Sequence, residues 1–212
     1  MNTALLLIYF LALYYIPVPG IGHAILEPQQ NLPLYIDKLL LGSYQDGTNY
    51  SWILTSLGFA ATVMTGVFAA YILQSGISQL SKLKTLFVTG LALVAAGLLL
   101  NPVQLIIKHV WTTSFTLFSS GLCFLLLALF YLVIDYWKYQ RWALFFIVVG
   151  SNSILAYMIA DLHCFSEVAE VFLSGTKRFL GDWYPFVLSI GSYVVFWLFF
   201  YFLYKKKIFI KV

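Results

Sequence analysis

Long apolar segments alternate with short polar connections along the whole sequence. A helix of about 20 apolar residues crosses a bilayer core of about 30 Å. Because lipid offers no hydrogen-bond partner to a free backbone group, we expect such segments to be α-helical. The pattern predicts an all-α polytopic membrane protein in which residues 1–212 form a single transmembrane domain. Its six predicted spans cover residues 3–18, 52–73, 85–100, 113–134, 142–160 and 184–204.

The composition is typical of this class. Apolar residues make up 62% of the chain and charged residues 9%, and the mean hydropathy is +0.90. Soluble domains have about 45–50% apolar and about 25% charged residues. The net charge of +4 comes from basic residues between the apolar segments and at the C-terminus, where they orient a membrane chain. We therefore expect a lipid bilayer around the protein and no nucleic acid as a partner.

The distribution of Lys and Arg among the connections predicts the orientation of the spans. Both termini are expected in the cytoplasm, so that the connections 19–51, 101–112 and 161–183 face outward. The inner side then carries Lys82, Lys84, Lys138, Arg141, Lys205, Lys206, Lys207 and Lys211, and the outer side carries Lys38, Lys108, Lys177 and Arg178.

The first predicted span is shorter than the others. It has about sixteen residues, which at about 1.5 Å per residue falls short of the hydrocarbon thickness. A signal peptide is an alternative, but the segment has no basic region before it and no small-residue cleavage site after it. We expect a helix whose natural beginning lies upstream of Met1.

The stretch 108–115 gathers polar groups where one apolar segment ends and the next begins. Its cation, indole and hydroxyls make Lys108, Trp111, Thr112 and Ser114 candidates for binding a substrate. The simpler alternative is the start of a helix at the membrane interface, where Trp is common. His109 lies in the same stretch, but the chain's three histidines are far apart and lack the spacing of metal ligands. We expect no metal site.

Asn152 and Ser153 lie midway along the fifth predicted span. A buried amide in a membrane helix either holds helices together or contacts a substrate, and the spacing leaves both roles open. The small residues Gly66 and Ala70, and those at 119–121, favour close helix packing and carry no predicted chemistry.

Several short motifs follow one another in a characteristic order. They are Val18-Pro19-Gly20, the run 31–42, Asp46-Gly47 before 53–73, Lys108-x-x-Trp111-Thr112-x-Ser114-Phe115, Gly150-x-Asn152-Ser153-Ile154-x-x-Tyr157, and Tyr204-Lys205-Lys206-Lys207-Ile208-Phe209. Their order and distances resemble the C-terminal part of the heparan-alpha-glucosaminide N-acetyltransferase-like family of membrane acyltransferases. The resemblance covers essentially the whole chain.

This resemblance implies transfer of an acetyl group from cytoplasmic acetyl-CoA to an amino sugar on the far side of a bacterial inner membrane. Such a reaction needs a base, donors for the developing oxyanion and cations for the phosphates of CoA. Lys205, Lys206 and Lys207 would hold phosphates, although an inner-side anchor also explains them. Asp37 or Asp161 would attract the amino sugar. The remaining candidates for donor or acceptor binding are Lys108, Trp111, Thr112, Ser114, Asn152, Ser153 and Tyr157.

The sequence also departs from the family. Members carry an essential histidine in an N-terminal motif, His-Ala-x-Trp-x-Gly, followed by Asp-x-Val-Phe-Pro, and neither motif occurs here. His23-Ala24 is followed by Ile25 and Leu26 and does not fit. Ile107 stands where an asparagine is common. The catalytic residue is therefore unknown, and the chain is expected to need an N-terminal half.

Three hypotheses remain open at the level of sequence. The first is the C-terminal portion of a transmembrane acyltransferase, incomplete as an isolated chain. The second is a non-catalytic membrane protein left by truncation, which packs against a partner or merely persists. Its expected partners are an N-terminal half or further copies of the chain in a homo-oligomer. The third is a small transporter, although the sequence shows no repeat that relates its halves and no charge at mid-membrane.

Overall fold

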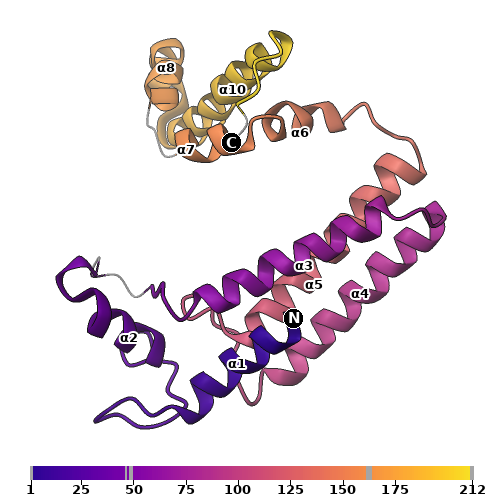
Figure 1. Cartoon of the computed structure of the whole chain (residues 1–212). Helices are drawn as coiled ribbons and strands as arrows, with labels where there is room; N and C mark the ends of the chain where they lie inside the picture. The colour runs from indigo at the N-terminus through magenta and orange to yellow at the C-terminus, as the bar shows by residue number, and fades with distance from the viewer. Residues whose placement is uncertain (1, 46, 48–49, 161–163, 211–212) are drawn as a thin grey trace. The chain divides into compact units, whose positions relative to one another are not determined.

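The structure is a computed structural model that describes residues 2–45, 47, 50–160 and 164–210. Regular secondary structure in these residues is helical, apart from one isolated bridge between Val18 and Gly22. The chain forms two compact units, Met1–Lys138 (unit 1) and Tyr139–Val212 (unit 2). Figure 1 shows the order of the helices in each unit. The all-α prediction is confirmed for the described part of the chain.

Unit 1 is built on three long helices that run side by side, α3, α4 and α5, with the shorter α1 against α3 and α5 (Figure 1). The short helix α2 lies in the connection between α1 and α3. The π-helical turn Leu132–Tyr136 continues α5. The bounds are α1 (Asn2–Tyr15), α2 (Leu32–Leu41), α3 (Ser56–Gln74), α4 (Gln79–Leu100) and α5 (Thr113–Tyr131).

Glycines allow α4 and α5 to pack closely. A Cβ atom added at Gly97 would lie 2.7 Å from the backbone nitrogen of Phe118, and one added at Gly121 would lie 2.6 Å from that of Val94. Contacts this short are sterically excluded, so a larger residue at either position would force the helices apart. Small residues that bring backbones together are the usual basis of helix packing in membranes.

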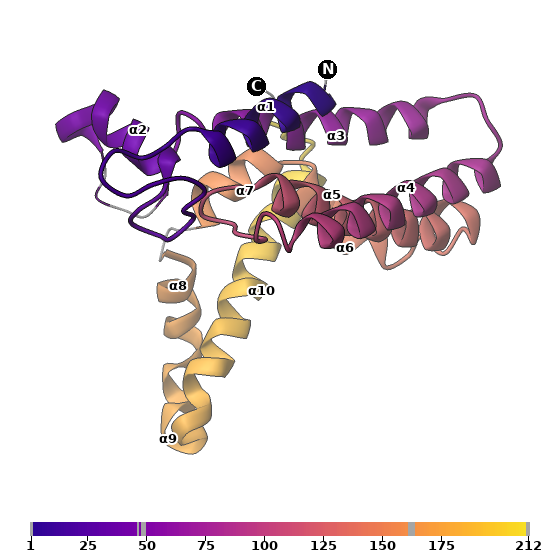
Figure 2. The same cartoon turned by 90° about the horizontal axis from the view of Figure 1, so that it is seen from below.

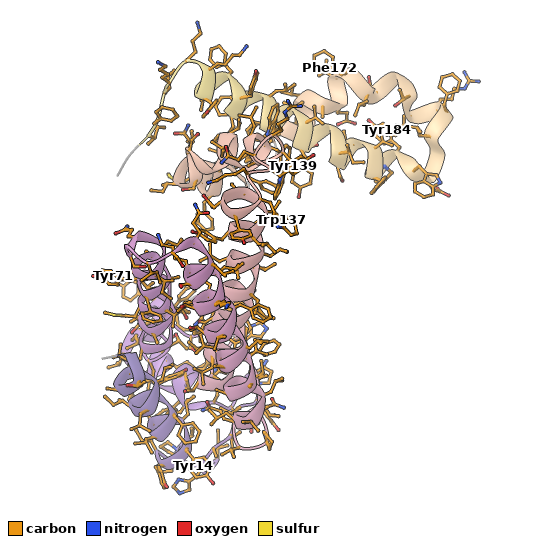
Figure 3. The ribbon with its side chains drawn as sticks, turned by 90° about the vertical axis from the view of Figure 1, so that its right-hand side faces the viewer. Tyr14, Tyr71, Trp137, Tyr139, Phe172 and Tyr184 are labelled. Carbon is orange, nitrogen blue, oxygen red and sulfur yellow. The ribbon has the colours of Figure 1, made fainter. Side chains whose placement is uncertain are left out.

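The two ends of unit 1 carry exposed aromatic side chains. Figure 3 shows Tyr14 at one end and Tyr71 and Trp137 toward the other. All three are exposed, with 42%, 68% and 63% of their surface accessible. Aromatic residues in two such belts are typical of helices that reach both interfaces of a bilayer.

Unit 2 contains one long helix, α10, and several short ones. Figure 2 shows α8 beside α10, and the ring of Phe165 on α8 lies 5.2 Å from that of Phe196 on α10. The indole of Trp197 on α10 donates to the carbonyl of Phe145 on α6 at 3.1 Å. The bounds are α6 (Ala143–Gly150), α7 (Ser153–Ala160), α8 (Cys164–Leu173), α9 (Lys177–Leu180) and α10 (Tyr184–Lys205).

Four segments of the described chain are long and apolar enough to cross a membrane. They are Ser56–Gln74, Gln79–Leu100, Thr113–Tyr136 and Cys164–Lys205, and they cover most or all of four of the predicted spans. The first predicted span forms a shorter apolar helix that ends at Tyr15, ahead of Pro17. The fifth is interrupted at Ser151 and Asn152, which separate α6 from α7. The orientation of the termini stays a prediction.

Candidate functional site

The connection between α4 and α5 in unit 1, residues 101–112, is held by side chains that bond to its own backbone. The side-chain oxygen of Asn101 accepts from the backbone N–H of Ile106 at 3.0 Å. That of Gln104, which is buried, accepts from the backbone N–H of Thr113 at 2.8 Å. The second bond satisfies one of the N–H groups that the start of α5 otherwise leaves free. These two hydrogen bonds therefore stabilise the backbone on which the candidate stretch 108–115 lies.

Thr112 is the N-cap of α5 and is completely buried. Its hydroxyl oxygen accepts from the backbone N–H groups of Ile107, at 3.1 Å, and Phe115, at 3.3 Å. The hydroxyl donates to the carbonyl of Leu105 at 2.8 Å, and the buried Ser114 donates to the same carbonyl at 3.0 Å. Both hydroxyls thus stabilise the connection, and neither is exposed to bind a substrate in this conformation.

Trp111 has its indole between α3 and α5. The indole N–H donates to the hydroxyl of Thr62 at 3.0 Å. The ring centroid lies 4.7 Å from that of Phe59 and 5.0 Å from that of Phe115, both edge to face. Gly58 leaves room for the ring, because an added Cβ there would lie 2.7 Å from the indole Cδ1. Trp111 has a backbone φ of 52°, a region that non-glycine residues occupy only where surrounding contacts maintain it.

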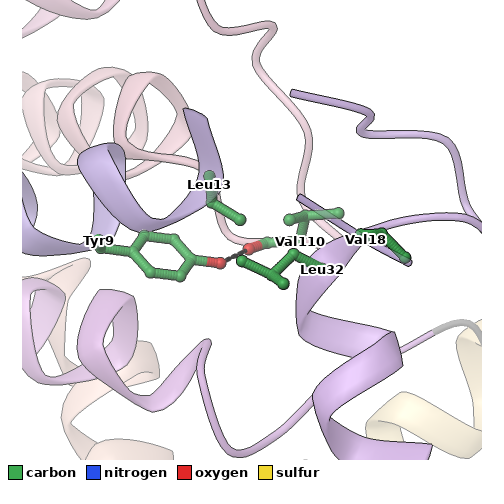
Figure 4. Packing of buried hydrophobic residues seen from close by; sticks show 5 residues of the cluster. All are labelled: Tyr9, Leu13, Val18, Leu32 and Val110. Atoms are coloured by element: carbon green, nitrogen blue, oxygen red, sulfur yellow. Dashed lines mark hydrogen bonds between the residues drawn. The ribbon is translucent and has the colours of Figure 1, made fainter. Parts of the chain in front are cut away.

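The first helix fixes the other side of the connection. The hydroxyl of Tyr9 donates to the carbonyl of Val110, and the hydroxyl of Thr113 donates to the carbonyl of Leu6 at 3.3 Å. Figure 4 shows the Tyr9 side chain directed at Val110 within a buried apolar cluster. Sequence reasoning missed Tyr9, because nothing in an apolar helix indicates which hydroxyl meets a carbonyl about a hundred residues away. The cluster consists of Tyr9, Leu13, Val18, Leu32 and Val110.

Asp37 on α2 is completely buried. Its two carboxylate oxygens accept from the backbone N–H of Trp52 at 2.5 Å and from that of Ile53 at 3.0 Å. Charge-assisted bonds of this kind are about twice as strong as neutral ones. The carboxylate that was predicted to attract an amino sugar therefore anchors the chain just before α3.

Lys108 and His109 are the exposed polar groups of the stretch 108–115. The imidazole of His109 lies with its centroid 4.5 Å from the ring of Tyr50. The side chains of Lys108 and His109 lie in the connection that precedes α5, and the backbone N–H of Trp111 donates to the carbonyl of Lys108 at 3.0 Å. Of the four candidates predicted there, Lys108 is exposed, Trp111 is partly buried, and Thr112 and Ser114 are buried.

Asn152 occupies the break between α6 and α7 in unit 2 and is buried. Its amide nitrogen donates to the carbonyl of Ile208 at 3.0 Å, and its amide oxygen accepts from the N–H of Ile210 at 2.8 Å. The side chain therefore holds the C-terminal segment 206–210. Both polar atoms of the amide thus bond to the C-terminal segment, and the contact of Asn152 with a substrate stays a prediction.

The other candidates in unit 2 are exposed. Ser153 and Tyr157 lie on α7, and 85% of the Tyr157 surface is accessible. Three exposed lysines end α10 and begin the C-terminal segment, and the ammonium of the first lies 5.2 Å from the ring centroid of Tyr201. Asp161 lies outside the described residues. The lysines are Lys205, Lys206 and Lys207.

Among the residues that the structure describes, no group of three or more His, Cys, Asp or Glu side chains is arranged to hold a metal ion. The sequence matches no protein-family model and no curated protein.

Proposed function

We propose that the chain is the C-terminal part of an acyltransferase of a bacterial inner membrane. The acetyl group of cytoplasmic acetyl-CoA passes to the amino group of a sugar on the far side. The amine nitrogen attacks the thioester carbonyl, and the C–N bond forms as the C–S bond breaks. A general base takes the amine proton and returns it to the leaving sulfur, so that CoA leaves as the thiol. An N-terminal half, on a separate chain or on the same one, supplies that base through the family's histidine motif, which does not occur in this sequence.

One observation carries the proposal: the motif that resembles the family's, Lys108-x-x-Trp111-Thr112-x-Ser114-Phe115, has a fixed conformation with Lys108 exposed. Buried hydrogen bonds of Thr112 and Ser114 maintain the backbone, and Trp111 is inserted between two helices. A pre-organised backbone of this kind holds a reactant without an ordering cost during the reaction. In the proposed site Lys108 contacts the acceptor sugar.

The acyl donor is assigned to the cations at the end of α10. Lys205, Lys206 and Lys207 are consecutive and exposed, and ammonium groups bind phosphate oxygens through charge-assisted hydrogen bonds. The proposal gives these residues the phosphates of CoA. It gives Thr112, Ser114, Asp37 and Asn152 a supporting role, because their polar atoms bond to the chain's own backbone.

The direct experiment is acetylation of glucosamine by membranes that contain this chain together with an N-terminal half carrying the histidine motif. Transfer of label from acetyl-labelled CoA to the sugar is the expected result, and membranes with either half alone should give none. Absence of transfer in every pairing would exclude the proposal.

A matched pair of variants tests the site. Lys108→Met removes the exposed cation and is expected to lower the transfer rate about tenfold, which corresponds to about 1.4 kcal/mol of lost transition-state stabilisation. Lys84→Met removes another exposed cation of unit 1 and should leave the rate close to that of the native chain. Equal rates for the two variants would remove Lys108 from the site.

A non-catalytic membrane protein is the second candidate. It is favoured by the hydrogen bonds of the buried polar side chains. Asp37, Thr112 and Asn152 all bond to backbone groups of the chain itself, which is a structural role. In that case Lys108→Met leaves every cellular phenotype of the native chain unchanged, and no acetyl transfer occurs with any N-terminal half.

A further inference from the structure

The helix α10 of unit 2 has an exposed apolar stripe along its whole length. Its members are four residues apart, so that they share one face of the helix. At about 1.5 Å per residue, the 22 residues of α10 measure about 33 Å, close to the hydrocarbon thickness of a bilayer. Lipid covers such a stripe without leaving a polar group unpaired, so α10 matches a helix that crosses the membrane. The stripe consists of Phe186, Ile190, Val194, Leu198 and Phe202.

The helices α7 and α8 follow α10 in the opposite direction. Near the C-terminal end of α10, Asn152 bonds to backbone groups of Ile208 and Ile210, and Ala156 of α7 belongs to the same buried cluster as Phe200. Farther along, α8 lies beside the N-terminal half of α10, and α9 lies where the chain turns back (Figure 2). The chain therefore runs beside α10 from the end of that helix to its start, first through α7 and then through α8.

Two contacts give the level of α8 along α10. The ring of Phe165 lies 5.2 Å from that of Phe196, and a Cβ atom added at Gly191 would lie 2.6 Å from Cδ1 of Leu173. Gly191 and Phe196 follow the first residue of α10 by seven and twelve positions, or by about 10 and 18 Å along the helix axis. The part of α8 between these two contacts therefore lies within the hydrocarbon thickness if α10 crosses the membrane.

Two carboxylates lie in that part of α8. Glu167 and Glu170 are both exposed, and neither has a hydrogen-bond or ion-pair partner in the part of the chain that the structure describes. Lipid is a strongly unfavourable environment for such a charge. Long Lys and Arg side chains reach the interface from this level, whereas a Glu side chain is too short. The two carboxylates therefore need water or a counter-charge beside them.

The face of α8 that carries them stays polar as far as α9. A spacing of three or four residues leads from Glu167 and Glu170 to Ser174 and Lys177, which are exposed as well. The helix α8, the turn 174–176 and α9 follow one another without a break, so these four positions share one side of the segment. We call them the polar stripe. Because the polar stripe continues to the end of the segment, it fits contact with water better than contact with a single counter-charge.

We infer that α7 and α8 form the arm that crosses the membrane beside α10, in place of residues 142–160, and that the polar stripe faces water that enters from the α9 end. Val168 and Phe172 fit this placement, because they are exposed on another side of α8 and meet lipid there. Small polar solutes then reach two carboxylates within the membrane from one side. The inference does not depend on the proposed acyl transfer, because it involves neither Lys108 nor the three lysines at the end of α10.

The experiment measures thiol modification of the full-length chain in liposomes of phosphatidylethanolamine and phosphatidylglycerol. Cys123→Ser and Cys164→Ser first remove the two native thiols, which are exposed. Single cysteines are then introduced one at a time, and a cationic, membrane-impermeant methanethiosulfonate is present on both sides of the membrane. Each reaction rate is divided by the rate for the same variant unfolded in sodium dodecyl sulfate. The variants are Glu167→Cys, Glu170→Cys, Val168→Cys, Phe172→Cys and Val194→Cys.

The two glutamate positions should react at least about tenfold faster than Val168→Cys, Phe172→Cys and Val194→Cys. All five replaced side chains are exposed, so helix content and thermal unfolding should match those of the native chain. Equal rates at all five positions would place α8 and α10 in water outside the bilayer and overturn the inference. Glutamate positions as slow as Val194→Cys would show that lipid or another protein covers the polar stripe, which overturns it as well. Neither result bears on acetyl transfer.

Discussion

Replacement of Trp111 by Ala is the sharpest test of how unit 1 holds its candidate site. The variant loses the hydrogen bond from the indole to Thr62 and both edge-to-face contacts, with Phe59 and Phe115. It also leaves a void between α3 and α5. Position 111, three residues after the exposed Lys108, would lose the contacts that maintain its backbone φ of 52°.

The magnitude follows from these contacts. Truncation of a buried Trp costs about 3–5 kcal/mol, and the lower value applies because Trp111 is only partly buried. In a domain of this size, each kcal/mol shifts the unfolding midpoint by about 2–4 °C. We therefore expect Trp111→Ala to lower the Tm by about 6–12 °C.

Trp111→Phe distinguishes the contribution of the aromatic ring to stability from that of the indole N–H hydrogen bond. It keeps an aromatic ring between the helices and loses the hydrogen bond, which contributes about 1 kcal/mol. The Thr62 hydroxyl still donates to the carbonyl of Gly58 at 2.9 Å, so no buried donor is left unpaired. The expected decrease in Tm is about 2–4 °C.

The assay is thermal unfolding in detergent, followed by far-UV circular dichroism. Trp183→Ala is the control, because 69% of the Trp183 surface is accessible and exposed substitutions usually change stability by less than about 0.5 kcal/mol. If Trp111→Ala unfolds at the same temperature as Trp183→Ala, the inserted indole does not hold α3 and α5 together and the reasoning is wrong.

Two further variants test the other buried polar residues. Asp37→Asn turns one accepting oxygen into a donor that faces a backbone N–H, so the free energy of unfolding should fall by about 2 kcal/mol, whereas the exposed Asp182→Asn should leave the Tm unchanged. Asn152→Ala removes both hydrogen bonds to the C-terminal segment, and trypsin should then cleave after Lys207 about tenfold faster than in the native chain. A cleavage rate equal to that of the native chain would show that Asn152 does not hold the segment.

The helical class and four long apolar segments follow from hydropathy alone. Composition and segment length suffice because a helix must hide its backbone from lipid along its whole length. The fifth predicted span is not one continuous helix, because it is interrupted at Ser151 and Asn152. A hydropathy average over the segment does not reveal this break, since the surrounding residues are strongly apolar. The hydropathy average also gives no information about the hydrogen-bond partners of the Asn152 side chain. These are backbone groups of Ile208 and Ile210, more than fifty residues later in the sequence.

The candidate site shows the same limit. Thr112 could be read as a helix cap, since hydroxyl residues at a helix start serve this role. The insertion of Trp111 between α3 and α5 could not be predicted from the sequence. A Trp at the end of a span is equally compatible with a position at the membrane–water interface. The burial of Asp37 could not be predicted either. Its hydrogen-bond partners are the backbone N–H groups of Trp52 and Ile53, and a backbone group leaves no signal in the sequence.

The contact of Asn152 with the C-terminal segment constrains how that segment can vary. The primary amide of Asn152 pairs with a carbonyl and an N–H, as a peptide group of a neighbouring strand would do. It recognises no side chain, so Ile208 and Ile210 are replaceable by other residues that keep the same backbone conformation. Proline is the exception at positions 208 and 210, because it has no N–H to donate to the carbonyl of Leu203 or to the amide oxygen of Asn152. A saturation library of residues 208–210 should therefore tolerate broad variation in side chains and lose proline at positions 208 and 210.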